Sequence, residues 1–301
     1  MRIFIEFMPC LGDLVTELPV LHALRERIHP LDVEVSVDRP GAELLEDYDW
    51  IGRQHVRAND WGSRVHPVAS SYREPFDLHL HLRSNPAIKL NRLLVRARCK
   101  LGTAAYDETV QDQGVVRHRF SILRHVFGEG LPEISTRIVL KPARTRDALA
   151  AAGFGEDAHI LCLGPGAGSP RRRWPVGRFA TLARALRQRF DGIAVLGSPV
   201  EAALCAELAG QTGAVSLVGW PLCSVAALLA RSALYLGNDS GLAHLAAAQG
   251  CPTISIGLAD PYYTPWNGYG VPGLLNDLSA EHVLTFLKEN VLGAASSARP
   301  A

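Results

Sequence analysis

Closely spaced cysteines are missing from this sequence. The 301 residues include six cysteines, no two of which form a CxxC pair, and they are scattered singly: Cys10, Cys99, Cys162, Cys205, Cys223 and Cys251. Zinc sites and disulfide scaffolds depend on cysteines at short or regular spacings. Their absence argues against both kinds of site, and we expect a cytoplasmic protein with free thiols.

Long apolar runs and an excess of charge of one sign are also missing. No run of about 18 apolar residues is present, and the N-terminus lacks the pattern of a signal peptide, so we expect membrane contact only at a surface. The 31 basic and 30 acidic residues give a net charge of +1. Because no overall field attracts nucleic acid, none is expected as a partner, and any affinity for anions must be local.

What the sequence does contain is a regular alternation of strand and helix patterns, typical of an α/β protein with parallel sheets. In the first half the patterns predict strands at 1–7, 33–37 and 77–82, and helices at 14–26, 42–48 and 86–100. In the second half they predict strands at 160–163, 193–196, 216–218, 234–236 and 253–256, and helices at 176–190, 200–209, 224–231, 242–249 and 280–291.

The length and the alternation together predict two Rossmann-like, doubly wound domains facing each other across a crevice. We place the first domain at residues 1–145 and the second at 146–292, near the proline-containing stretch before a helix at 145–152. The last helix either stays with the second domain or packs back on the first. Residues 293–301 are mostly small and are expected to form a flexible tail. Ligands of such domains bind beyond the carboxyl ends of the strands, so the site residues are expected in the loops there.

One such loop is the turn at 238–244, with the sequence NDSGLAH, between an apolar run and an alanine-rich stretch. Asp239 or Ser240 is suited to cap the following helix, and Gly241 allows backbone to approach a ligand. The unpaired N–H groups of a helix start favour a negative charge. The alternative is an ordinary capped helix after a strand.

A second loop, at 164–175, has the sequence GPGAGSPRRRWP. Its three glycines allow close approach of backbone, and its three consecutive arginines carry planar, permanently charged groups that suit phosphate. A solvated surface loop is the alternative, but the position at a strand end favours a diphosphate site.

Two carboxylates follow other strands. Glu201 comes after the strand ending near Gly197, where it either complements a helix dipole or accepts hydrogen bonds from a ribose diol. Asp13 follows the first strand, where it either caps a helix or takes a proton from an acceptor hydroxyl.

In combination these segments resemble glycosyltransferase family 9, the ADP-heptose:lipopolysaccharide heptosyltransferases. The matching pieces run in family order over nearly the whole chain: GDLV at 12–15 with LPV at 18–20; PGA at 165–167 with RRWP at 172–175; Gly197 with Glu201; LVG at 217–219; and DSGLAH at 239–244 with AA at 246–247 and GCP at 250–252. Each piece is weak alone, whereas the set at this spacing is specific for the family and much less specific for the substrate.

The resemblance implies a GT-B fold in which the second domain holds the nucleotide sugar and the first holds the acceptor. Asp13 matches the proposed general base. Arg172 or Arg173 matches the phosphate-binding residue, and Ala167 and Gly168 stand where some members have phosphate-holding threonines. Glu201 is expected at the ribose and Asp239 at the sugar hydroxyls. The diphosphate is expected at the backbone of Ser240 and Gly241, supported by His244, which is otherwise a packed core histidine.

No metal is expected, because arginine and a helix N-terminus can offset the charge of a leaving diphosphate. The triplet Asp47-Tyr48-Asp49 is instead expected to be a surface feature.

For the acceptor we single out a basic region with Arg83, Lys89 and Arg92, continued by Arg96, Arg98 and Lys100 and then by Arg117, His118 and Arg119. It is either a solvated helix face or a cradle for an anionic, lipid-linked glycan.

The predicted function is therefore the transfer of a sugar, heptose from ADP-heptose, to a hydroxyl of a lipopolysaccharide-core or related glycan by an inverting mechanism. The nucleotide sugar is a co-substrate, and no cofactor is expected. Work at the cytoplasmic face of the inner membrane would bring such a chain to its acceptor. Two alternatives stay open: a nucleotide-sugar epimerase or hydrolase with the same fold, and a non-catalytic nucleotide-sugar- or glycan-binding protein.

Overall fold

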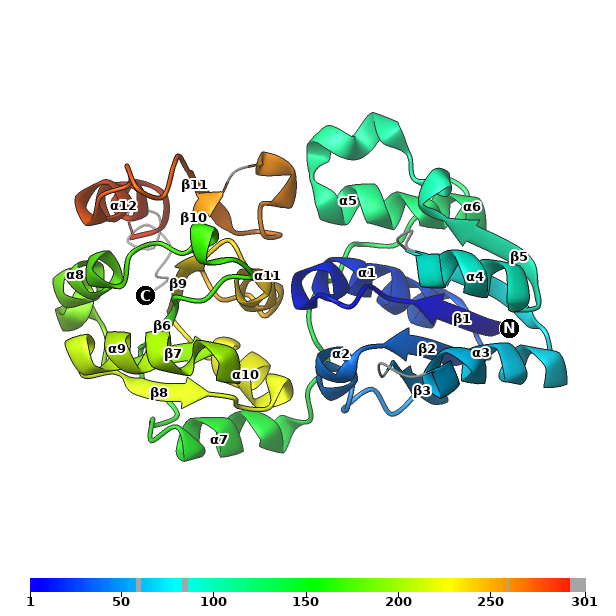
Figure 1. Ribbon diagram of the computed structural model, residues 1–301, viewed down its shortest axis with the longest axis horizontal. Helices are drawn as coiled ribbons and strands as arrows, with labels where there is room; N and C mark the ends of the chain where they lie inside the picture. The colour runs from blue at the N-terminus through cyan, green and yellow to red at the C-terminus, as the bar shows by residue number, and fades with distance from the viewer. Residues whose placement is uncertain (58–60, 83–85, 259, 293–301) are drawn as a thin grey trace, which may run out of the picture. The chain divides into compact units, whose positions relative to one another are not determined.

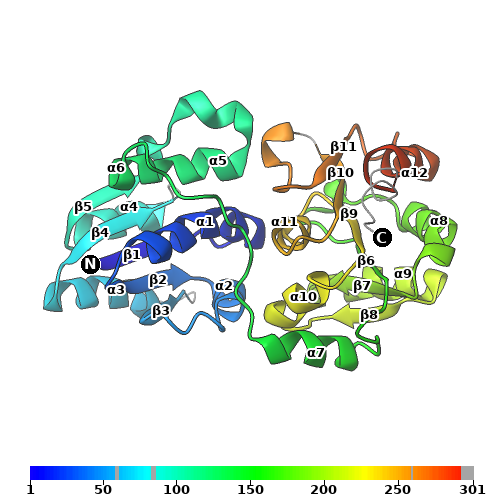
Figure 2. The same cartoon turned by 180° about the vertical axis from the view of Figure 1, so that it is seen from behind.

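The computed structural model describes the backbone of residues 1–57, 61–82, 86–258 and 260–292, and their side chains except for those of 61–66, 86–89 and 258. The chain divides into two units, Met1–Val139 and Leu140–Ala301. Each unit contains one parallel sheet (Figures 1 and 2).

The first unit is built on a five-stranded sheet with the order β3-β2-β1-β4-β5. Its strands are β1 (Arg2–Glu6), β2 (Asp32–Val37), β3 (Arg53–Val56), β4 (Phe76–His81) and β5 (Ala97–Gly102). Its helices are α1 (Leu11–Arg27), α2 (Arg39–Leu44), α3 (Trp61–Arg73), α4 (Pro86–Leu94), α5 (Val115–Phe120) and α6 (Arg124–Phe127). The strand order reverses between β1 and β4, and α1 and α5 lie side by side in both views.

The second unit is built on a six-stranded sheet with the order β11-β10-β9-β6-β7-β8. Its strands are β6 (Ile160–Gly164), β7 (Gly192–Gly197), β8 (Val215–Val218), β9 (Leu234–Asn238), β10 (Thr253–Leu258) and β11 (Tyr269–Pro272). Its helices are α7 (Pro142–Ala151), α8 (Val176–Leu186), α9 (Ala202–Thr212), α10 (Leu222–Leu229), α11 (Gly241–Ala248) and α12 (Ala280–Leu287). Here the order reverses between β6 and β9, so this sheet is also doubly wound.

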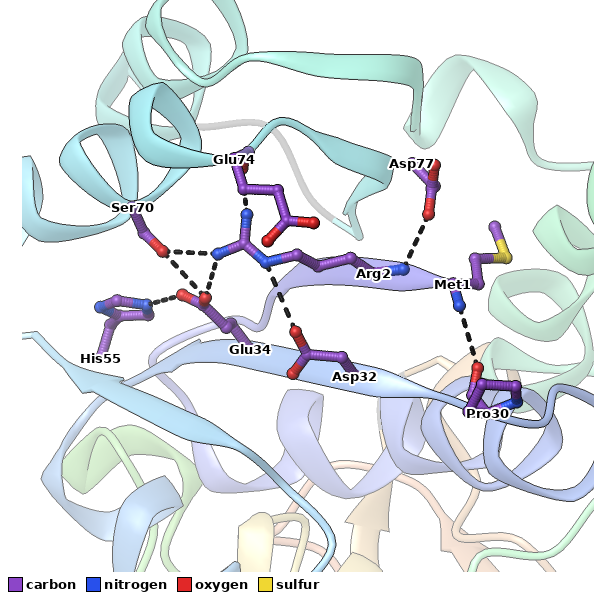
Figure 3. Close-up of polar contacts among 9 residues, drawn as sticks. All are labelled: Met1, Arg2, Pro30, Asp32, Glu34, His55, Ser70, Glu74 and Asp77. Carbon is purple, nitrogen blue, oxygen red and sulfur yellow. Dashed lines mark hydrogen bonds and ion pairs between the residues drawn. The ribbon is translucent and has the colours of Figure 1, made fainter.

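The two faces of the first sheet differ in chemistry. Ile3, Ile5 and Val35 are fully buried on one face, as expected for a parallel sheet covered by helices. On the other face buried ionisable side chains follow one another along the strands. Near its start Arg2 forms an ion pair with Glu34, which also accepts hydrogen bonds from His55 Nε2 at 2.6 Å and Ser70 Oγ at 2.8 Å (Figure 3).

The hydrogen-bond partners of Glu34 favour its charged form. Burial raises the pKa of the Glu34 carboxyl, but the hydrogen bonds from His55, Ser70 and Arg2 outweigh it and lower that pKa to about 2. Further along the same face Glu6 accepts hydrogen bonds from His79 Nε2 at 3.2 Å and from Asn91 Nδ2 at 2.5 Å. The Asn91 side chain of α4 therefore contacts a polar face of the sheet.

The prediction of two doubly wound parallel α/β sheets is confirmed. The single helix predicted at 86–100 is wrong: α4 ends at Leu94 and β5 follows as the edge strand next to β4. Strands β3 and β11 and helices α3, α5 and α6 were not predicted. Strands β3 and β11 have four residues each, and β11 contains glycine and proline, so neither has a clear periodicity.

The units meet at Val139–Leu140, six residues before the predicted boundary, because α7 begins at Pro142 rather than at residue 145. Proline is favourable in the first turn of a helix, where its missing N–H costs nothing. The last helix, α12, stays with the second unit, since Val283 and Leu287 join the core that includes Phe179 of α8. The predicted tail, 293–301, lies outside the described residues.

Candidate active site

The general base predicted from sequence, Asp13, lies in the first turn of α1, directly beyond β1 at the point where the strand order of the first sheet reverses. Arg119 Nη2 donates to Asp13 Oδ1 at 2.6 Å, and Arg119 Nη1 donates to the Asp13 carbonyl at 3.0 Å. The Asp13 side chain keeps 16% of its surface accessible. The carboxylate is thus oriented by a cation and still reachable.

The partner of Asp13 was not recognised from the sequence. Arg119 was placed with Arg117 and His118 in a surface basic region, which is wrong, because Arg119 and His118 are both buried. Burial alone would lower the pKa of the Arg119 guanidinium, but the Glu17 and Asp13 carboxylates raise it. Asp13 and Arg119 are 106 positions apart, so no local sequence signal links them.

In the second unit the loops after β6 and β9 meet where the strand order reverses. Gly164 and Gly237 are in register at the ends of these strands. Asn238, which is fully buried, joins the two loops: its Oδ1 accepts from the Trp174 backbone N–H at 2.9 Å and its Nδ2 donates to the Pro165 carbonyl at 2.7 Å. Asn238 was not predicted to be a site residue, although it is the first residue of the NDSGLAH turn.

The same meeting point brings two of the predicted donor residues together. Arg172 donates through Nη2 to the Asp239 carboxylate and, at 3.0 Å, to the Asp239 carbonyl. The Arg172 side chain is half-exposed. Arg173 instead turns into its own loop, where its Nη2 donates to the Ala167 carbonyl at 3.3 Å. Of the two candidate arginines, Arg172 therefore reaches the β9–α11 turn.

The described first turn of α11 receives no hydrogen bond from the side chain at its N-cap position. Ser240 is the N-cap residue, yet its side chain makes no capping hydrogen bond to the first turn, all of which lies in the described part of the chain. The expectation that Asp239 or Ser240 caps this helix is thus wrong in part, since Ser240 occupies the position without forming the bond. N–H groups of this kind, at residues such as Gly241, suit an anion.

Glu201 lies against the glycine-rich loop. Its Oε2 accepts from the Ser198 N–H at 2.9 Å and from the Ser198 hydroxyl at 2.7 Å, which forms a capping box. A Cβ added at Gly166 would lie 2.0 Å from Glu201 Oε1, so only glycine allows this approach. Ala167 is buried in the same loop and Gly168 is exposed. The loops after β6 and β7 are therefore adjacent.

The remaining predicted positions are a histidine on α11, three basic residues of the first unit and the DxD triplet. His244 lies on α11 with 8% of its surface exposed, so most of its ring is enclosed by protein. Arg83 lies outside the described residues, as does the side chain of Lys89, whereas Arg92 is exposed at the end of α4. Asp47 is buried, so the expected surface position of the DxD triplet holds only for Asp49.

Two further features of the described residues bear on the site. No group of three or more His, Cys, Asp and Glu side chains is placed to hold a metal ion within that part of the chain. A cavity between α7 and α10 is lined by Lys141, Arg144, Trp220 and neighbouring residues, and none of the predicted site residues lines it.

Comparison with known proteins then decides the family. The sequence profile described as glycosyltransferase family 9 (heptosyltransferase) matches residues 95–283, more than half of the chain. The chain belongs to glycosyltransferase family 9. The resemblance drawn from the motifs and the prediction of a glycosyltransferase are thereby confirmed.

Relatives of this family 9 chain carry heptosyltransferase names. It is 30% identical over 159 residues to lipooligosaccharide heptosyltransferase 2 of Haemophilus influenzae, a match that covers 46% of this chain and 43% of the relative. It is 22% identical over 289 residues to lipopolysaccharide heptosyltransferase 3 of Escherichia coli, covering 85% and 84% of the two chains. The chain thus spans less than half the length of the first relative in that match and most of the second.

The structure of E. coli heptosyltransferase WaaC with ADP superposes on the family 9 chain with a TM-score of 0.76 at 20% sequence identity, covering 98% of this chain and all of the other. This likeness confirms the GT-B fold. None of the helices described in the structure combines the length and the hydropathy that a bilayer span needs.

Proposed function

We propose that this family 9 chain transfers heptose from ADP-heptose to a hydroxyl of a lipopolysaccharide-core or related glycan, with inversion and without a metal ion. The observation that carries the proposal is the meeting of Arg172, Asp239 and the uncapped start of α11 where the strand order of the second sheet reverses. Doubly wound sheets bind nucleotides at such points. The WaaC structure, which has the same fold, was solved with ADP.

The donor half combines a cation, a helix start and two carboxylates. Arg172 and the N–H groups at Ser240 and Gly241 would hold the diphosphate, whose negative charge grows as the sugar leaves. Binding would exchange the Arg172–Asp239 ion pair for one between Arg172 and phosphate, which releases Asp239 for the sugar hydroxyls. Arg173 would act by holding the loop of Ala167 and Gly168 in place.

Glu201 and His244 complete the proposed donor half. Glu201 lies beside Gly166 at the end of β7, a position that suits a ribose diol, although its carboxylate already binds Ser198. His244 would support the diphosphate from α11. Both assignments derive from the family pattern. The contacts of Glu201 directly support its role at the ribose. The burial of His244 gives less direct support for its role at the diphosphate.

The acceptor half is centred on Asp13. A carboxylate that is held by Arg119 and remains partly exposed is placed to accept the proton of an attacking hydroxyl. Arg83, Lys89 and Arg92 would bind the anionic groups of a lipid-linked glycan. No step of this scheme needs a metal, because Arg172 and the α11 N–H groups supply the positive charge at the leaving group.

The deciding experiment incubates the purified chain with ADP-heptose in the presence and absence of a heptose-acceptor core glycan, with and without a chelator. We expect ADP release and glycan mass gain only when the acceptor is present, unchanged by the chelator. Donor conversion without acceptor would instead indicate an epimerase or hydrolase. Donor binding without conversion under any condition would indicate a binding protein, and activity restored only by a divalent ion would contradict the metal-free mechanism.

A further inference from the structure

The described side chains of helix α4, those of residues 90–94, place a polar residue inward and leucines outward. Its Asn91 points inward and donates to Glu6 Oε1 at 2.5 Å, because the sheet face beneath it carries the buried Glu6 and His79. Its leucines lie outside: Leu93 is 78% exposed, and Leu90 and Leu94 are each 43% exposed. Ordinary surface helices turn such residues toward the core.

Basic residues lie before and after these leucines in the sequence. Among the side chains that the structure describes in residues 67–100, five are those of lysine or arginine: Arg73, Arg92, Arg96, Arg98 and Lys100. The acidic residues of the same segments are Glu74 and Asp77, and Arg98 Nη1 lies 3.4 Å from Asp77 Oδ1. Tyr72 is 60% exposed at the end of α3, with the Arg96 guanidinium carbon 5.5 Å from its ring centre.

We propose that this α4 surface, formed by Tyr72, Leu90, Leu93, Leu94, Arg92 and Arg96, docks the chain on an anionic bilayer. Leucines on one face of α4 and the tyrosine at the end of α3 can enter the acyl–headgroup boundary, while arginines bind lipid phosphates at the level of the headgroups. Both kinds of side chain are exposed in the same unit, and Arg96 lies over the Tyr72 ring. This surface does not depend on which sugar the chain transfers, so the docking proposal does not rest on the proposed function.

Charge and apolar exposure together select a bilayer among possible partners. A nucleic acid would match the arginines but leave Leu93 in contact with water or phosphate. A second protein would bury the leucines, but long arginine side chains that remain hydrated suit a surface of lipid phosphates better than a closely packed interface.

The test is co-sedimentation of the full chain with vesicles that contain no glycan acceptor. Equimolar phosphatidylglycerol and phosphatidylcholine vesicles are compared with pure phosphatidylcholine vesicles. Leu93→Ser is paired with Leu274→Ser, since Leu274 is 75% exposed in the second unit, and Arg96→Ala is paired with Arg184→Ala, an exposed arginine of α8. Thermal unfolding verifies that each variant is folded.

We expect binding to the anionic vesicles, weakened by salt, and weak binding to the neutral ones. Leu93→Ser and Arg96→Ala should each lower the partition coefficient about five-fold, the factor expected for one lost membrane-contacting group, and their controls should match the unaltered chain. Equal binding to both vesicle types, or equal loss in Leu93→Ser and Leu274→Ser, would overturn the proposal. So would self-association of the chain that Leu93→Ser abolishes, because a second copy would then cover the leucines.

Discussion

At the scale of single residues, the chemistry depends on which charged groups are paired. Arg119 is buried between the Asp13 and Glu17 carboxylates, to which it donates at 2.6 and 3.2 Å. A buried guanidinium with two carboxylate partners stays charged, so Arg119 fixes the direction of the Asp13 side chain. Arg172 has a different status, because it is half-exposed and can exchange its partner for a ligand.

The substitution Asp13→Asn tests the proposed base. Asparagine keeps an oxygen that accepts from Arg119 but cannot take a proton, so turnover should fall by about 10²–10⁴-fold with donor affinity nearly unchanged. Rates of ADP release and calorimetric titration with ADP measure the two quantities. Asp49→Asn, at an exposed carboxylate, serves as the control, and turnover within a few-fold of normal in Asp13→Asn would exclude Asp13 as the base.

The substitution Arg172→Ala tests the diphosphate site. Loss of a charged hydrogen-bond donor should weaken ADP binding by about 10–100-fold, corresponding to roughly 1.5–3 kcal/mol. Its neighbour Arg171 is exposed in the same arginine run, so Arg171→Ala changes the overall charge equally and should alter the affinity by less than about two-fold. Equal effects of the two variants in calorimetric titrations would mean that the run acts only as diffuse positive charge.

At the scale of elements, the proposed donor site depends on two loops that lie far apart in the sequence. Asn238, at the end of β9, hydrogen-bonds to the backbone before and after the arginine run, at Pro165 and Trp174. The Trp174 ring is itself buried, and its Nε1 donates to the Leu278 carbonyl at 2.8 Å. Arg172 is therefore presented from a loop that is tied to the core at both ends.

We expect Asn238→Ala to destabilise the second unit. It leaves the buried Trp174 N–H and the Pro165 carbonyl without this partner, which should cost about 2–4 kcal/mol of the free energy of unfolding. Denaturant unfolding measures the change, and ADP affinity should fall in parallel because the loop loosens. Asn276→Ala, at an exposed side chain, is the matched control; an unfolding midpoint in Asn238→Ala equal to that of this control would contradict the role of Asn238.

At the scale of the whole molecule, the polar face of the first sheet makes stability depend on pH. His81, 4% exposed at the end of β4, has its pKa lowered from 6.5 to about 4, mainly by burial. The ring fits there because its neighbour on β5 is Gly102, where a Cβ would lie 1.7 Å from His81 Cε1. Glu34, in the network of Figure 3, has its pKa lowered from 4.5 to about 2.

Both shifts destabilise the fold as the pH falls, in successive windows. Between pH 6.5 and about 4 the unfolded chain binds a proton at His81 that the folded chain does not, and between 4.5 and about 2 the same holds for Glu34. The thermal midpoint should therefore drop through the first window and again through the second. His81→Gln should flatten the first drop and Glu34→Gln the second, whereas curves parallel to that of the unaltered chain would contradict the assignment.

Local sequence patterns were sufficient to predict the fold class and the family, and they locate the strand-end loops that contain the candidate site residues. Strands such as Ile160–Gly164 and Leu234–Asn238 consist mainly of apolar residues, and glycine, proline and charged residues follow them in local patterns. Local patterns depend on backbone geometry and on burial of neighbouring side chains, so they can be recognised in the sequence before the fold is known. The same rule fails for the helix predicted at 86–100, where pairing with β4 overrides local preference.

Only the tertiary structure decided which of these residues meet. It paired Asp13 with Arg119 and Arg172 with Asp239, the latter across 67 positions, and it turned the leucines of α4 outward. Such pairings follow from strand order, which places the ends of β6 and β9 side by side although two strands and three α-helices separate them in sequence. A single sequence contains no local record of strand order, since that order results from the packing of all the strands and helices of a sheet at once.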